Sequence, residues 1–167
     1  MRGMKKIGVI SDTHCFFDDK LKHFLSEVDM IWHAGDFGNL ETADKIAAFK
    51  PLAGVYGNID DAQVRIVHPQ YQCFECEGVK VLMTHIGGYP GRYEPDTRLK
   101  IDQYKPRLFI SGHSHILKVM PDRRRNLLHI NPGAAGINGF HHVRTAVRFI
   151  LDKGDIRDLE VGEWPRR

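Results

Sequence analysis

Three aspartates, one asparagine and four histidines of this chain occur in short polar clusters, each directly after an apolar stretch. The clusters are Asp12-Thr13-His14, Gly35-Asp36, Gly57-Asn58-Ile59-Asp60, Thr84-His85 and Gly112-His113-Ser114-His115. If the apolar stretches are parallel neighbouring strands, all the clusters emerge at one edge of a sheet. Carboxylate, amide and imidazole side chains in this combination suit hard-to-borderline divalent cations, and there are enough of them for two ions. The pattern therefore predicts a metal site.

The spacing within the clusters also indicates what such a site could do. Asp12 with His14, and His113 with His115, are two residues apart, so each pair can face one side of an extended turn. A bridging carboxylate, here Asp36, holds two cations roughly 3.5–4 Å apart. Two such cations lower the pKa of a shared water and neutralise the oxygens of a phosphate ester. These are the requirements of phosphate-ester hydrolysis.

Each of these residues alone also has a purely structural explanation. Asp12 could cap a turn, and Gly57-Asn58 is a common turn pair. His85 could be a hydrogen-bonded core histidine. Asp60 is expected to hold the loop or a ligand in place without binding metal itself. Because the structural explanations would have to hold independently at every cluster, the metal site is favoured.

The first half of the chain alternates between strand and helix patterns. Strands are predicted at 5–11, 30–34 and 52–56, where short apolar, β-branched runs occur. Apolar residues at helical spacing predict helices over 18–28 and 40–49, the second ended by a proline. This β-α-β-α-β order predicts a parallel sheet with right-handed crossovers.

The second half is richer in strands. A helix is predicted over 94–104 and a buried strand over 108–111. Turn residues between apolar runs predict three hairpins, formed by 71–76 with 79–84, 116–121 with 126–131, and 145–151 with 156–161. We expect an α/β fold in which two sheets form a β-sandwich flanked by helices on both outer faces. Residues 1–167 are expected to form a single domain.

Composition excludes several classes of function. The net charge is +3 and the pI about 8.8, without the clustered basicity of a dedicated nucleic-acid binder. The basic run 123–125 is expected to be a solvated hairpin turn. No apolar run is long enough for a membrane span and no signal peptide is evident, so a cytoplasmic protein without a membrane partner is expected. The Walker pattern of P-loop enzymes is absent from the sequence.

Cys73 and Cys76 form a C-x-x-C pattern inside a predicted strand. Residues three apart on a strand face opposite sides, so this pair is not expected to form a disulfide. A redox C-x-x-C would open a helix instead. Packing is therefore the expected role of both cysteines.

The ordered motifs D-x-H, G-D, G-N-x-D, T-H and G-H-x-H resemble those of the calcineurin-like metallophosphoesterases, most closely their small single-domain bacterial and archaeal phosphodiesterases. The resemblance spans Asp12 to His115 and implies the same two-sheet fold. It implies a first metal at Asp12, His14 and His115, and a second at Asn58, His85 and His113, with Asp36 bridging them. The residues that it implies take part in catalysis are Asp36, Asn58, Asp60 and His85.

The resemblance further implies a dinuclear metal-dependent phosphodiesterase that hydrolyses a small phosphate ester by attack of a metal-bridging hydroxide. A phosphomonoesterase or nucleotidase with the same core is one alternative. A protein-binding scaffold, like the retromer subunit of this fold, is another. Mn²⁺ is the expected metal, while Fe, Zn²⁺, Ni²⁺ and Co²⁺ also suit mixed histidine and carboxylate ligands. A homodimer formed through exposed sheet edges stays open.

The sequence departs from the family pattern at two positions. Many relatives have a histidine after the G-N dipeptide that can protonate the leaving group, and Ile59 stands there instead. We therefore expect either a preference for activated esters or another proton source. The candidates for that source are Asp60, His141, His142 and metal-bound water. Ile86, where many relatives have glycine after the metal histidine, is expected to reshape the rim without removing a ligand.

Groups that would bind the substrate are not specified by the motifs. Arg65, Arg92, Arg98 and Arg144 are each able to clamp phosphate oxygens. The sequence does not choose among them. The glycine-rich segment 87–92, close to His85, is a candidate rim.

Overall fold

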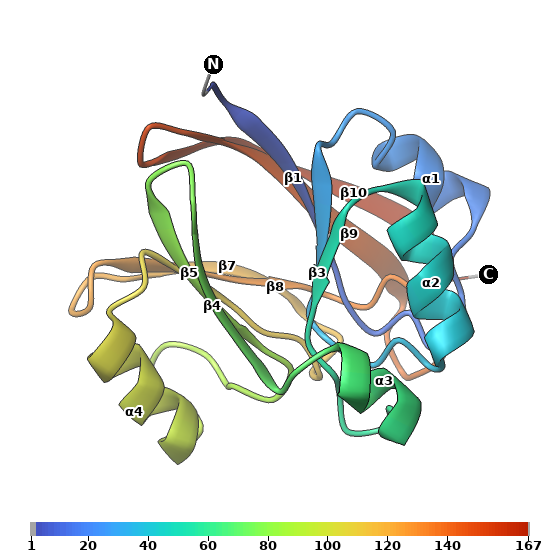
Figure 1. Ribbon diagram of the computed structural model, residues 1–167, viewed down its shortest axis with the longest axis horizontal. Coiled ribbons are helices and arrows are strands. Elements are labelled where there is room, and N and C mark those ends of the chain that lie inside the picture. The colour runs from blue at the N-terminus through green and yellow to red at the C-terminus, as the bar shows by residue number, and fades with distance from the viewer. Residues whose placement is uncertain (1–2, 167) are drawn as a thin grey trace.

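The computed structural model describes residues 3–166, which form two five-stranded sheets packed face to face (Figure 1). The first sheet has the order β10-β9-β1-β2-β3, with β1 at Lys5–Ile10, β2 at Met30–His33, β3 at Leu52–Gly54, β9 at Val143–Asp152 and β10 at Asp155–Pro165. The second has the order β4-β5-β6-β8-β7, with β4 at Tyr71–Cys76, β5 at Val79–Thr84, β6 at Leu108–Ile110, β7 at Leu117–Asp122 and β8 at Leu127–Pro132. The predicted α/β sandwich is confirmed.

Each sheet contains three neighbouring parallel strands. In the first, β1 pairs in parallel with β2, and β2 with β3. In the second, β5 pairs in parallel with β6, and β6 with β8. Because parallel strands end on the same side, the loops after β1, β2 and β3 lie together, as do those after β5 and β6.

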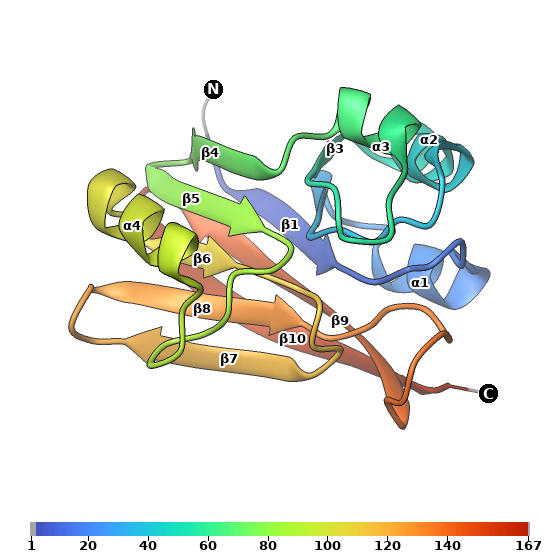
Figure 2. The same cartoon turned by 90° about the horizontal axis from the view of Figure 1, so that it is seen from below.

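Helices cover both outer faces of the sandwich, as predicted (Figure 2). The first sheet is covered by α1 (Asp19–Phe24), α2 (Leu40–Phe49) and α3 (Ala62–Val67). The second sheet is covered by α4 (Pro95–Tyr104), whose Ile101 packs with Leu82 and Phe109. Within residues 3–166, no helix has the length and apolar character needed to cross a membrane.

Two helices differ from the sequence-based prediction. The first was predicted over 18–28 but ends at Phe24, because Asp29 hydrogen-bonds Lys6 through both backbone and side chain and draws the chain back to β1. Helix α3 was not predicted. Of its apolar residues Val64 is buried while Ile66 and Val67 are exposed, so it lacks the apolar stripe that marks a helix.

The C-x-x-C pair lies in β4, and both cysteines are free, as predicted. Cys76 packs against the core between the sheets. Cys73 is exposed, so the packing role predicted for it was wrong.

The core between the sheets joins residues far apart in the chain. Trp32 of β2 contacts Phe74 of β4 and Phe149 of β9 edge to face, with ring centroids 5.1 and 5.8 Å apart. Val81 and Ile110 of the second sheet belong to the same cluster. This packing fixes the distance between the two sets of loops that carry the polar clusters.

Replacing Phe149 with alanine is expected to lower the free energy of unfolding by about 3–5 kcal/mol, because a fully buried ring leaves a cavity between the sheets. Urea denaturation followed by circular dichroism measures the change. Val119→Ala, at a position that is 43% exposed on β7, is the control and should change stability by less than about 0.5 kcal/mol. Equal effects of the two substitutions would contradict this account of the core.

Candidate metal centre

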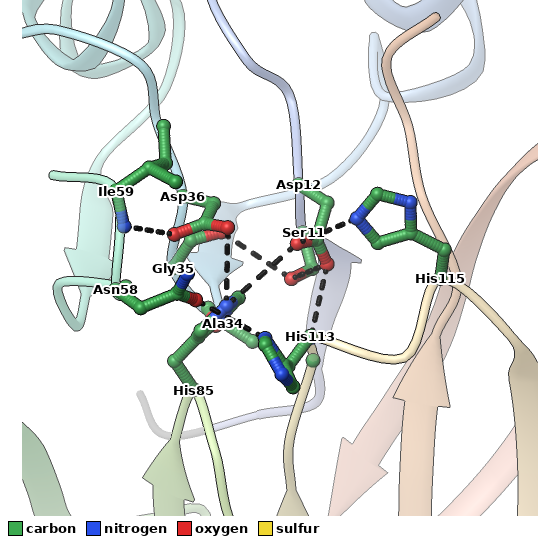
Figure 3. Close-up of polar contacts among 12 residues, drawn as sticks. Ser11, Asp12, Ala34, Gly35, Asp36, Asn58, Ile59, His85, His113 and His115 are labelled. Atoms are coloured by element: carbon green, nitrogen blue, oxygen red, sulfur yellow. Dashed lines mark hydrogen bonds and ion pairs between the residues drawn. The ribbon is translucent and has the colours of Figure 1, made fainter. Parts of the chain in front are cut away.

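The loops after β1, β2, β3, β5 and β6 meet at one end of the sandwich. Figure 3 shows Asp12, Asp36, Asn58, His85, His113 and His115 directed toward one another from these loops. The Nε2 atom of His14 lies 3.5 Å from Asp36 Oδ2, so His14 belongs to the same cluster. All the side chains predicted as ligands are thus brought together, from both sheets.

Asp12 lies at the centre of one group of these side chains. Its Oδ1 atom is 3.2 Å from His115 Nε2, 3.8 Å from His85 Nε2 and 3.9 Å from His14 Nε2. Its Oδ2 atom accepts hydrogen bonds from the Ser11 hydroxyl and the His113 backbone N–H. These two bonds orient the carboxylate so that Oδ1 faces the histidines.

Asp36 lies between histidines that the family resemblance assigns to different ions. Its Oδ2 atom is 3.3 Å from His85 Nε2 and 3.5 Å from His14 Nε2. Its Oδ1 atom accepts a hydrogen bond from the Ile59 backbone N–H. One carboxylate oxygen therefore has access to both halves of the cluster.

Asn58 and His113 complete the other side of the cluster. Asn58 Oδ1 lies 3.1 Å from His113 Nδ1, and the His113 ring centroid is 5.2 Å from that of His85. Both residues are exposed, whereas Asp12, Asp36 and His85 are buried. The cluster therefore has a buried floor and an open side toward solvent.

Several buried polar atoms of the cluster lack a hydrogen-bond partner among the described residues. They are Asp12 Oδ1, His14 Nε2 and His85 Nε2. The opposite ring atom of His85, Nδ1, lies 2.7 Å from Ala34 O and donates to it, so Nε2 presents a lone pair toward the carboxylates. Lone pairs that face carboxylate oxygens require a cation or a proton between them. Asp12, His14 and His115 form one set that could hold an ion, and Asp12, Asp36 and His85 form another.

The cluster shifts the pKa values of its members in the direction expected for such groups. Burial alone would raise the pKa of Asp12, but the facing imidazoles of His115 and His14 hold it well below its usual range. The Asp12 carboxylate raises the pKa of His14. At His85, burial alone would lower the pKa, but Asp36 and Asp12 raise it above its usual value. A divalent cation would take the place of these protons.

Asp60 holds the loops that carry Asp36 and Asn58. Its Oδ2 atom accepts backbone N–H bonds from Asp36, Phe37 and Gly57 at 2.8–3.2 Å. Its Oδ1 atom accepts one from Gly38 at 3.0 Å. The side chain is 2% exposed and acts only as an acceptor. It is therefore a positioning residue, as the sequence suggested, and is not placed to protonate a leaving group.

His33, at the end of β2, is a positioning residue that the sequence did not reveal. Gly35 N–H donates to His33 Nδ1 at 3.0 Å, which places the ring proton on Nε2. That atom lies 3.0 Å from Thr13 Oγ1, and the Thr13 hydroxyl donates to Phe37 O at 3.0 Å. The chain of bonds links the Asp12 loop to the Asp36 loop. The strand pattern around His33 is that of any buried strand, so no local signal marked this role.

The contact of Asn138 with the cluster was not predicted from the sequence either. Its side-chain amide lies 3.3 Å from His14 Nδ1 and so contacts the ring on the side away from the carboxylates. The contact joins residues 124 positions apart, in a loop without a motif of its own. Such a contact can be found only in the folded chain.

The backbone at the cluster is strained. Asp12, His14, Asp36, His113 and His115 all have φ values between 46° and 74°, in the left-handed region that non-glycine residues rarely adopt. Strain of this kind is retained where the surrounding structure fixes it, and it gathers at functional sites. The adjoining glycines have a matching role, because a Cβ atom on Gly57 would collide with the Asp36 carboxylate and one on Gly112 with the Ser11 hydroxyl.

Two of the arginines considered as substrate clamps are engaged elsewhere. Arg65 donates to the carbonyls of Asp60 and Asn58 and stacks on Tyr56, so it supports the loop from behind. Arg144 is 3% exposed and pairs with Asp18. Arg92 and Arg98 are exposed.

The two candidate histidine proton donors lie in the loop between β8 and β9. His141 Nε2 lies 2.8 Å from Gly136 O, and burial lowers the pKa of the ring, so its one N–H is bonded to the backbone. This makes His141 a poor proton donor. His142 is exposed beside it.

Comparisons with known proteins agree with this geometry. A family model described as the calcineurin-like phosphoesterase superfamily domain matches residues 4–154. A relative from Methanocaldococcus jannaschii, named a probable metallophosphoesterase, is 30% identical over 143 residues, which cover 79% of this chain and 69% of the relative.

Two solved structures share the fold. One, described as a novel archaeal phosphodiesterase, has a TM-score of 0.70 at 21% identity and covers 94% of this chain and 99% of its own. The other is Vps29 from Chaetomium thermophilum, with a TM-score of 0.71 at 17% identity over 96% of this chain and 98% of its own. At these identities the similarity shows the fold alone.

Asp60→Asn is expected to lower the free energy of unfolding of the metal-free protein by about 2–3 kcal/mol. An amide would place its NH₂ group against backbone N–H donors that now bind a carboxylate. Urea denaturation measures the change. Asp61→Asn is the matched control, because Asp61 caps α3 by accepting from Val64 N–H and asparagine caps equally well. If both variants were equally stable, Asp60 would not have the role described.

Proposed function

Because this chain belongs to the calcineurin-like phosphoesterase superfamily, we propose that it is a dinuclear metal-dependent phosphodiesterase acting on a small phosphate ester. The first ion would be held by Asp12, His14 and His115, and the second by Asn58, His85 and His113. Asp36 would bridge them. The cluster described above contains all of these groups, with their donor atoms facing one another.

The position of Asp36 Oδ2 carries the proposal. It lies 3.5 Å from His14 and 3.3 Å from His85, one histidine from each proposed ion site. A bridging carboxylate must reach both ions, and a site for a single ion would not need this arrangement. The unpartnered Nε2 atoms of both histidines support it further.

The chemistry divides between the ions and the chain. Bound divalent cations, of which Mn²⁺ is the first choice, would supply a nucleophile at neutral pH and neutralise the oxygens of the phosphate. The chain's own residues hold the ligands in place: Ser11 and His113 N–H orient Asp12, Asp60 fixes the loops, and Ala34 O orients His85. This pre-organisation limits the movement needed during reaction.

A diester is favoured over a monoester by the charges around the site. A monoester dianion carries a second negative charge, which phosphatases commonly bind with arginine. Of the candidate arginines, Arg65 and Arg144 are occupied by partners within the fold, and neither Arg92 nor Arg98 lines the hollow beside His113 and His115. A diester, with a single negative charge, needs no additional cation.

A protein-binding scaffold with structural metal is the second candidate. The fold of Vps29 supports it, as does the exposure of Ile59 and Ile86 beside the cluster. It differs from the leading proposal in predicting metal binding without hydrolysis. The following assay separates the two.

Chelator-treated protein should hydrolyse bis(p-nitrophenyl) phosphate only after Mn²⁺ is added, and more efficiently than it hydrolyses p-nitrophenyl phosphate. Asp36→Asn and His85→Ala should each reduce kcat/KM by at least about 100-fold, since each removes a metal ligand. His23→Ala, an exposed histidine on α1, is the control and should retain full activity. Failure to hydrolyse either ester with Mn²⁺, Zn²⁺, Ni²⁺ or Co²⁺ would refute the enzyme and favour the scaffold.

Ile59→His should restore a proton donor beside the leaving group. Ile59 is 46% exposed and its backbone binds Asp36, so a histidine there would reach the open side of the cluster. General acid catalysis helps poor leaving groups most. The wild-type rate should therefore fall steeply from p-nitrophenyl methyl phosphate to phenyl methyl phosphate, and the variant should narrow this gap by about tenfold or more. A wild-type rate insensitive to the leaving group would show that another group already supplies the proton.

A further inference from the structure

A groove of about 740 Å³ opens directly beside the candidate metal centre. It runs between the loop 113–117, which carries two of the proposed ligands, and the loop 139–143. His113 and His115 line both the groove and the cluster. A molecule bound to the metals through a phosphate could therefore extend into this groove.

Three large apolar side chains are exposed in the groove, among polar residues that include four histidines. Phe140 is fully exposed, Ile116 is 63% exposed and Val143 is 39% exposed, and all of them line it. Large apolar side chains that gather in one exposed hollow commonly mark a binding site. Among the described residues that line it there is no lysine or arginine, and Glu163 is the one carboxylate. The apolar side chains suit an uncharged group, and Glu163 would repel an anionic one.

The loop 139–143 is held in position by contacts of its own. The Arg166 guanidinium donates to Gly139 O, and His141 is bonded to Gly136 O. Gly139 has a φ of 136°, and a Cβ atom there would collide with the rings of His115 and His141. The His141 ring packs edge to face on His115, with centroids 5.1 Å apart. Phe140 is therefore presented at the groove by a loop that packs directly on a proposed metal ligand.

The groove also lies on a defined side of the cluster. Ile59, where a leaving group would be protonated in related enzymes, is on one side of the carboxylates, and His115 is on the opposite side (Figure 3). In an in-line displacement the attacking oxygen lies opposite the leaving group, so the retained ester group extends sideways from that axis. If the leaving group is on the Ile59 side, it is the retained group that can reach the side of His115. The groove begins at that residue.

We propose that this groove is the subsite for the ester group that stays on phosphorus, and that it accepts an uncharged aromatic group stacked against Phe140 and Ile116. The inference rests on the proposed phosphodiesterase function. It narrows the substrate class to diesters with an aryl or heteroaryl group on the retained side and no further phosphate there. A flat ring suits the groove because ring–ring contact with Phe140 adds to the burial of apolar surface.

The test uses substrates that share one leaving group. Methyl p-nitrophenyl phosphate and phenyl p-nitrophenyl phosphate both release p-nitrophenolate, so they differ only in the retained group. With the Mn²⁺-loaded protein, kcat/KM should be about tenfold higher for the phenyl ester, chiefly through a lower KM. A carboxylate in the para position of the retained phenyl ring should remove this advantage, and Glu163→Gln should partly restore it.

Substitutions in the groove test whether it causes the preference for the phenyl ester. Phe140→Ala and Ile116→Ala should each bring the phenyl-to-methyl ratio of kcat/KM close to one. Phe140 is fully exposed, so its replacement does not threaten folding. Ile66→Ala is the control for loss of an exposed isoleucine, because Ile66 is 84% exposed on α3 and does not line the groove, so the ratio should be unchanged.

The outcomes separate this inference from the function on which it rests. Hydrolysis of both esters without preference for phenyl, or a preference that survives in Phe140→Ala and Ile116→Ala, would overturn the subsite alone. Absence of hydrolysis of the methyl ester and of bis(p-nitrophenyl) phosphate would overturn the phosphodiesterase itself. A preference that is lost only in the groove variants supports the assignment.

Discussion

The candidate metal centre depends on one buried carboxylate that is not itself a ligand. Asp60 accepts backbone N–H bonds from Asp36, Phe37, Gly38 and Gly57, and so joins the loop after β2 to the loop after β3. Bonds from neutral donors to a buried carboxylate are about twice as strong as ordinary ones. Together with the bond from Ile59 N–H to Asp36 Oδ1, they fix the loop that carries Asp36 against the loop that carries Asn58.

The same constraint explains the strain around the cluster. Side chains that must turn back over the ends of their own strands need left-handed backbone at Asp12, His14 and Asp36. Each such residue costs on the order of 1–2 kcal/mol, and the surrounding hydrogen bonds offset this cost. Glycines beside the ligands allow the loops of the two sheets to approach closely enough for one carboxylate to face several histidines. The centre is rigid because its loops are fixed from several directions.

Exposed isoleucines occur in the same turns as the polar residues of the cluster. The floor contains the carboxylates and histidines, whereas the rim exposes Ile59, Ile86, Ile116 and Ile137. Each of these isoleucines directly follows a residue of the cluster or of its supporting loops, so the rim is built from the same turns as the floor. These exposed isoleucines suit an ester with one negative charge and uncharged organic groups. They also leave the leaving-group proton without a donor on the Ile59 side.

The sequence determined most of the fold and the composition of the candidate site. Parallel β-α-β patterns place strand ends together whatever the details of the loops, so the clusters from Asp12 to His115 could be identified from local spacing alone. The boundaries of the helices were harder to predict. Helix α1 ends before the predicted residue because of the long-range bond between Asp29 and Lys6. Helix α3 was not predicted because most of its apolar residues are exposed. Both depend on contacts or exposure that no local window contains.

Only the tertiary structure decided how the site is supported and what surrounds it. The bonds of His33 to Thr13, of Asn138 to His14, and of Arg65 to the Asn58 loop depend on which loops the packing of the two sheets brings together. The groove between Ile116 and Phe140 likewise joins segments that are separate in the chain. Ligand types can be recognised from the sequence because the chemistry of a metal restricts them. The residues that support the ligands and shape the rim cannot be recognised in this way. Many different residue types can make such supporting contacts once the fold has brought them close.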